Sequence, residues 1–94
     1  MREISAKTKR RVKKRLSAEK PTIWVGKTGV SQELLKEVDK QLDKNEMVKI
    51  KILKSALESS KTKEVAAQIA EQTRSSLVEV RRGNTFMLYK RRKK

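Results

Sequence analysis

The sequence predicts one α/β domain with a compact two-layer architecture, in which three helices pack on a four-stranded mixed sheet. The expected order of elements is α-β-α-β-α-β-β. A chain of 94 residues has the length of a single domain. Along it, stretches with helical spacing alternate with short runs rich in β-branched residues. Strand–helix–strand units favour parallel crossovers, and a glycine turn between the last two strands requires an antiparallel pair, so the sheet is mixed.

The first predicted helix covers residues 5–19 and is strongly basic on one side. Thr8, Val12 and Leu16 recur every four residues and form a narrow stripe suited to burial. At about 100° per residue, four basic side chains lie broadly opposite that stripe. They are Lys7, Arg10, Arg11 and Lys14. Pro21 discourages further helix, and the short β-branched run at 22–25 predicts the first strand.

The middle of the chain contains the clearest helix and the clearest strand. Residues 31–45 carry leucine and valine at helical spacing, and Ser31 is suited to cap the first turn. Residues 46–53 alternate between apolar side chains and lysines, which predicts a strand buried on one face. Lys49 and Lys51 then lie on the outer face, where we expect either a solvated surface or contacts with a ligand.

The last third of the chain predicts one helix and two strands: residues 59–74, 76–81 and 85–90. Gly83 lies between the two strands, where a hairpin turn favours glycine. We expect one domain over residues 1–90. The segment 91–94 is entirely basic and has no pattern that requires folding, so we expect it to be disordered.

The composition narrows the classes of function. Cysteine and histidine are absent, which excludes disulfides, thiolate or imidazole metal sites and nucleophile–histidine catalysis. No apolar run approaches the ~20 residues that span a bilayer, and the N-terminus has no apolar signal region. We therefore expect a cytoplasmic protein that is not an enzyme, needs no cofactor, takes no small-molecule substrate and binds no membrane.

The net charge of +15 is concentrated in the two ends of the chain. Residues 1–20 hold nine Lys and Arg against two Glu, and residues 74–94 hold eight against one Glu. Residues 21–73 hold nine Lys against eight acidic residues. This distribution favours a polyanion such as nucleic acid, contacted by both ends of the chain. Basic tails that are only solvated have the same composition.

The stretch WVGKTGVS, residues 24–31, admits two interpretations. Gly26-Lys27-Thr28 resembles the end of an NTPase phosphate loop, but that loop needs glycine where this chain has Pro21. Gly26-Lys27-Thr28-Gly29 is also a GxxG loop placed between a strand and a helix. Free N–H groups at the start of a helix and glycines without Cβ suit the approach of an RNA backbone. The alternative is a tight turn that only needs a positive φ.

Several segments, taken in order, resemble the CRM domain family, which is named for chloroplast RNA splicing and ribosome maturation. They are KPTIWVGKTGVSQELLKEVDKQLDKNEMVKIKI and VEVRRGNTFMLYKR, and the resemblance covers roughly residues 5–90. Most similar in build are the single-domain prokaryotic YhbY-like RNA-binding members. The resemblance implies a fold similar to the C-terminal domain of translation initiation factor three. It also implies RNA binding through the GxxG loop and neighbouring basic surface, and a role in large ribosomal subunit assembly.

Ten residues are expected to contact RNA. They are Gly26, Lys27, Thr28 and Gly29 in the loop, Lys7, Arg10, Arg11 and Lys14 on the first helix, and Arg91 and Arg92 after the last strand. The expected partner is ribosomal RNA of the large-subunit precursor, bound by a monomer. General binding of DNA or chromatin, and a role as an RNA-splicing or RNA-chaperone factor, are the alternatives.

For the three aromatic residues, the sequence predicts which are buried in the core. Trp24 precedes the loop, and a tryptophan in a short strand favours a core or partly buried position over base stacking. Phe86 and Tyr89 lie on opposite sides of the last predicted strand, with one of them in the core.

Overall fold

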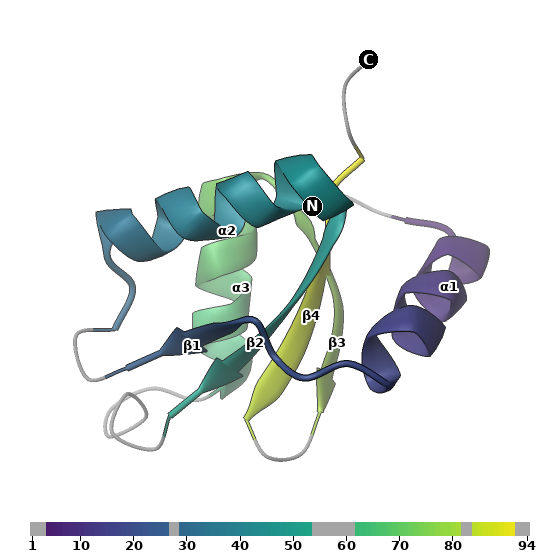
Figure 1. Cartoon of the computed structure of the whole chain (residues 1–94), viewed down its shortest axis with the longest axis horizontal. Coiled ribbons are helices and arrows are strands. Elements are labelled where there is room, and N and C mark those ends of the chain that lie inside the picture. Colours follow the sequence, from purple (N-terminus) through teal and green to yellow (C-terminus); the bar gives the residue numbers. More distant parts are fainter. Residues whose placement is uncertain (1–3, 27–28, 54–61, 82–83, 92–94) are drawn as a thin grey trace.

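The computed structural model describes residues 4–26, 29–53, 62–81 and 84–91 of the chain (Figure 1). The helices and strands are α1 (Ala6–Ser17), β1 (Ile23–Val25), α2 (Gln32–Asn45), β2 (Met47–Ile52), α3 (Thr62–Thr73), β3 (Ser76–Arg81) and β4 (Thr85–Tyr89). The predicted α/β class and the order α-β-α-β-α-β-β are confirmed. The turn at Gly83, the first residues of the predicted third helix and most of the tail lie outside the described residues.

The four strands form one mixed sheet in the order β1-β2-β4-β3. β1 and β2 are parallel and are joined through α2, so this strand–helix–strand unit forms the expected crossover. β4 lies between β2 and β3 and is antiparallel to both. β1 and β3 are therefore the edge strands of the sheet, and the predicted mixed sheet is confirmed.

The larger hydrophobic core lies on the face of the sheet that α2 and α3 cover. Its buried members are Ile23, Val25, Val38, Leu42, Val48, Ile50, Ile52, Val65, Ala66, Ile69, Ala70, Phe86 and Leu88. The alternating apolar residues of β2 all point to this side, as the sequence pattern predicts.

The opposite face carries a second, smaller core beneath α1. Val12 and Leu16 of the helix stripe pack there with Met47, Val78, Met87 and Tyr89. Helices therefore cover both faces of the sheet, and α1 adds a partial third layer to the two layers expected from the sequence (Figure 1). Phe86 and Tyr89 lie on opposite faces as predicted, and both are buried.

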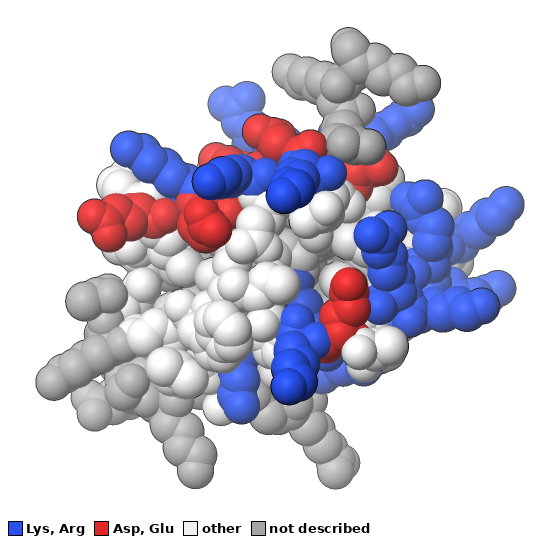
Figure 2. Space-filling model, in the orientation of Figure 1, with Lys and Arg blue, Asp and Glu red and all other residues white. Residues whose placement is uncertain are grey.

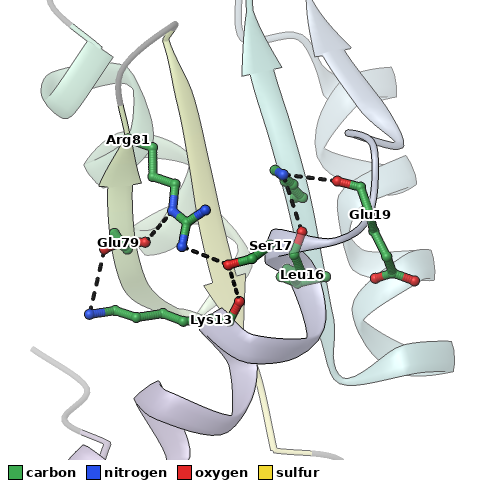
Figure 3. Close-up of polar contacts among 7 residues, drawn as sticks. Lys13, Leu16, Ser17, Glu19, Glu79 and Arg81 are labelled. Atoms are coloured by element: carbon green, nitrogen blue, oxygen red, sulfur yellow. Dashed lines mark hydrogen bonds and ion pairs between the residues drawn. The ribbon is translucent and has the colours of Figure 1, made fainter.

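Charged side chains fasten the C-terminal half of α1 to β3 (Figure 3). Lys13 Nζ lies 3.5 Å from Glu79 Oε1, and Arg81 Nε donates to Glu79 Oε2 at 2.5 Å. Arg81 Nη2 also donates to Ser17 Oγ at 2.7 Å. The hydrogen bond from Arg81 is the main cause that lowers the pKa of Glu79 below its usual value, and the charges of Arg81 and Lys13 add to it.

The C-terminal end of α1 is held from a second strand by Lys49. The Lys49 ammonium group donates to the carbonyl oxygens of Leu16 at 3.1 Å and Glu19 at 2.8 Å. The Leu16 carbonyl lies in the last turn of α1 and carries part of its negative charge, which a cation stabilises, whereas the Glu19 carbonyl belongs to the segment directly after the helix. Lys49 is thus half-buried and stabilises the fold. This role is neither the solvated surface nor the ligand contact expected from the sequence.

Candidate nucleic-acid interface

The GxxG loop lies at the carboxyl ends of the parallel strands β1 and β2, directly before α2 (Figure 1). Gly29 N–H donates to Gly26 O at 2.9 Å, so the loop is a closed turn. Gly29 has a φ of 71°, which L-residues with side chains rarely adopt. The expected tight turn with positive φ is therefore present, whether or not the loop also binds a ligand. Lys27 and Thr28 lie outside the described residues.

Gly26 differs from Gly29 because the fold itself does not require glycine there. A Cβ built on Gly26 meets no atom within 4 Å, and its φ is not positive. A methyl group at this position would meet neither a steric clash nor the strain of a positive φ. The open approach to the Gly26 backbone is the feature that a bound sugar-phosphate chain would use.

The start of α2 carries the positive end of the helix dipole, which favours an anion at this end of the sheet. Ser31 Oγ accepts the N–H of Leu34 at 3.1 Å, which confirms the predicted N-cap. The helix of 14 residues points its positive end toward the loop. Glu33 in the first turn offsets part of that charge.

The second basic region is the outer side of α1. The four predicted residues are all exposed: Lys7, Arg10, Arg11 and Lys14. Figure 2 shows Lys and Arg side chains gathered over α1, whereas positive and negative side chains mix over α2. Arg11 also packs on the sheet, because its guanidinium lies 5.8 Å from the centroid of the Tyr89 ring and 3.5 Å from its hydroxyl.

Arg91 lies at the end of the sheet away from the loop. It is exposed and follows β4 at the end of the sheet where Tyr89 meets Arg11. The backbone N–H of the preceding Lys90 donates to Glu46 O at 2.8 Å, and its Nζ lies 3.9 Å from Asp39 Oδ1. These two contacts hold this end of β4 against α2. Arg92 lies outside the described residues.

The structure therefore divides the predicted site residues into two groups. The loop and α1 lie toward opposite ends of the longest axis of the molecule, which measures 36 Å (Figure 1). The loop group contains Gly26 and Gly29, and the α1 group contains Lys7, Arg10, Arg11 and Lys14, while Arg91 follows β4 at the end of the sheet away from the loop. One small ligand could not contact both groups, whereas a nucleic acid of about ten base-pair steps, at roughly 3.4 Å each, has the required length.

One expectation about the site is wrong. Trp24 is 54% exposed, and is neither in the core nor covered. Ile23 and Val25 point into the larger core, so Trp24 points to the other face, where α1 packs against β2, β3 and β4. The alternation of residues in β1 indicated that Trp24 points away from Ile23 and Val25. The sequence did not show that this outer side of the edge strand would be exposed.

Within the described ranges, no helix is long and apolar enough to cross a membrane. The same part of the chain holds no group of three or more His, Cys, Asp or Glu residues placed to bind a metal ion.

Comparison with known proteins connects this geometry to a family. The chain is 34% identical over 79 residues to MJ0652 of Methanocaldococcus jannaschii, covering 84% of this chain and 58% of that protein. It is 31% identical over 90 residues to YqeI of Bacillus subtilis, covering 96% of this chain and 91% of that protein. Both relatives carry the name probable RNA-binding protein. The chain spans less than two thirds of the archaeal relative.

A solved structure has the same fold. The solution structure of SAV1595 from Staphylococcus aureus, described as a candidate RNA-binding protein, superposes with a TM-score of 0.76 at 28% identity. The match covers 98% of this chain and 93% of that one. Residues 4–90 match the CRS1 / YhbY (CRM) domain family. The match extends from α1 through β4, and the chain therefore belongs to the CRM domain family.

Proposed function

We propose that this protein is a non-catalytic RNA-binding protein that holds the RNA backbone with its GxxG loop and the basic side of α1, and that acts in large ribosomal subunit assembly. The observation that carries the proposal is the unobstructed backbone at Gly26, in the loop that leads into α2. The names of the two relatives and of the solved structure support RNA as the ligand.

The charge distribution supports contact with phosphates at two places. The side chains of Lys7, Arg10 and Lys14 make no hydrogen bond or ion pair with other described residues and extend from one side of α1. Lys and Arg residues on one face attract a nucleic-acid backbone without reading its bases. Two contact points on one domain suit a monomer lying along a folded RNA, and a single domain over residues 1–90 is part of this proposal.

The experiment that tests this function is ultraviolet crosslinking in growing cells, with sequencing of the attached RNA. We expect enrichment of one region of large-subunit ribosomal RNA. Gly26→Asp places a carboxylate where the phosphate would lie and should reduce the crosslinks about tenfold, because like charges repel. Gly26→Ala is the matched control and should retain most crosslinks, since its Cβ meets open space.

Gly26 is a better test position than Gly29, because a side chain at φ 71° adds backbone strain. Equal thermal unfolding midpoints would show that both Gly26 variants are folded. Crosslinks spread evenly over all transcripts, or enriched in introns, would contradict the assembly role. Unchanged crosslinking of folded Gly26→Asp would contradict the role of the loop, and equal affinity of the purified protein for duplex DNA would favour general nucleic-acid binding.

A further inference from the structure

Trp24 is an exposed aromatic residue held by a well-packed strand. It is 54% exposed, whereas its neighbours Ile23 and Val25 are 4% and 1% exposed. The buried neighbours fix the backbone of β1, so the indole is presented on a firm support at the edge of the sheet. A large apolar ring in this situation points to a ligand, since most tryptophan side chains are largely buried.

The surroundings of Trp24 define the chemistry of that ligand. Lys51 pairs with Trp24 in the parallel register of β1 and β2, and it is exposed. Leu53 is 41% exposed, and its N–H donates to Val25 O at 2.9 Å. Alternation along β2 places Leu53 on the same face as Lys51. We call these three residues, Trp24, Lys51 and Leu53, the Trp24 platform.

The platform lies directly beside the loop. Gly26 follows Trp24 by two residues at the end of the same strand, so both are presented at the carboxyl edge of β1. A nucleotide whose phosphate rests on the loop backbone could therefore place its base on the indole. Lys51 would lie next to the same nucleotide, where an ammonium group attracts phosphate.

We propose that the Trp24 platform stacks an unpaired RNA base while the loop holds the adjoining phosphate. The ligand class at this end of the domain is then single-stranded or bulged RNA, since a base inside a helix cannot offer its face to a side chain. This inference rests on the proposed function. Two apolar side chains and a lysine are too small for a stable protein interface, which buries about 800 Å² on each partner, but they match one base.

Comparing the binding of two RNAs distinguishes base stacking on Trp24 from attraction of phosphates alone. The probes are a short unstructured RNA strand and a duplex of equal length, at the same salt concentration. Trp24→Ala should weaken binding of the strand roughly 5- to 150-fold and change binding of the duplex less than about twofold. Trp24→Phe keeps an aromatic face and should restore most of the affinity for the strand.

Val80→Ala is the matched control, because Val80 is an apolar residue 38% exposed on the other edge strand. It should leave both affinities unchanged. Trp24 is the one tryptophan of the chain, so its fluorescence reports directly on stacking. We expect the unstructured strand to quench that fluorescence, and the duplex to quench it much less.

The outcomes distinguish the two proposals. A wild-type protein that binds neither RNA would overturn the proposed function and the platform together. A wild-type protein that binds RNA would overturn the platform alone if folded Trp24→Ala kept its affinity for the strand, or lost it equally for strand and duplex. Fluorescence that the strand does not change would also overturn the platform.

Discussion

At the scale of single residues, Lys49 and Lys51 show how the same residue type acquires different roles on one strand. They are two positions apart and point to the same face of β2. Lys49 is half-buried and donates to one carbonyl in the last turn of α1 and to one just after it. Lys51 lies beyond the end of the helix and is exposed. Where α1 ends on the sheet therefore decides which lysine serves the fold and which can serve a ligand.

This difference gives a prediction for stability. Lys49→Met removes both hydrogen bonds to the end of α1 and should lower the free energy of unfolding by roughly 1–2 kcal/mol. Lys51→Met should change it by less than about 0.5 kcal/mol, as is usual at exposed positions. Urea unfolding of the two variants beside the wild type measures this. Equal effects of the two substitutions would contradict the structural role of Lys49.

The sequence predicted which face each residue of β1 and β2 points to, but not which helix covers that face. Alternation placed both lysines on the outer face, and the same alternation separated Trp24 from Ile23 and Val25. Burial of an outer face depends on which helix crosses it, and that contact is made by α1, more than thirty residues away from Lys49 along the chain. For this reason the loop, which is local, could be located from sequence, whereas the exposure of Trp24 could not.

At the scale of elements, α1 was predicted as a helix from its stripe, but the stripe does not say which face of the sheet it covers. Val12 and Leu16 would suit either face. Met47, Met87 and Tyr89 provide the second apolar surface, and they alternate with residues of the larger core on β2 and β4. Both strands are central in the sheet. β4 is apolar on both faces and β2 adds Met47 to the second face, which explains why helices form layers on both sides.

The attachment of α1 to β3 should depend on pH through Glu79. Its pKa is lowered in the folded protein, mainly by the hydrogen bond from Arg81. Because a lowered pKa favours the ionised folded state, the stabilisation is fully present above the ordinary pKa of 4.5 and is lost as pH falls through the lower folded value. The effect is modest, since partly exposed ion pairs contribute about 0.2–1 kcal/mol.

Glu79→Gln tests this dependence. The variant should be less stable than the wild type by a constant amount between about pH 5 and 7, and the difference should shrink as pH falls below the usual range of a glutamate. Urea unfolding at a series of pH values provides the measurement, with Glu37→Gln as the control because Glu37 is exposed on α2 beyond its first turn. A difference that stayed constant down to the lowest pH would show that Glu79 acts by packing and not by charge.

At the scale of the whole molecule, the distance between the loop and α1 decides what kind of RNA can satisfy both. The two groups lie toward opposite ends of a 36 Å axis, and the mixed charges of α2 lie on a different part of the surface (Figure 2). A ligand held at both ends makes phosphate contacts through α1 in addition to those of the loop. The number of such contacts sets how steeply affinity falls with salt.

Two double variants with equal changes in net charge can test the contact through α1. Replacing Lys7 and Lys14 of α1 by Gln removes two phosphate contacts, so the slope of log affinity against log salt should become shallower by about 1.5. Replacing Lys36 and Lys40 of α2 by Gln removes the same charge from a surface already balanced by acidic residues, and it should leave the slope nearly unchanged. Filter binding of a structured large-subunit RNA fragment over a salt series measures both slopes. Equal flattening by the two variants would mean that net charge alone attracts the RNA, and contact at both ends of the domain would then be wrong.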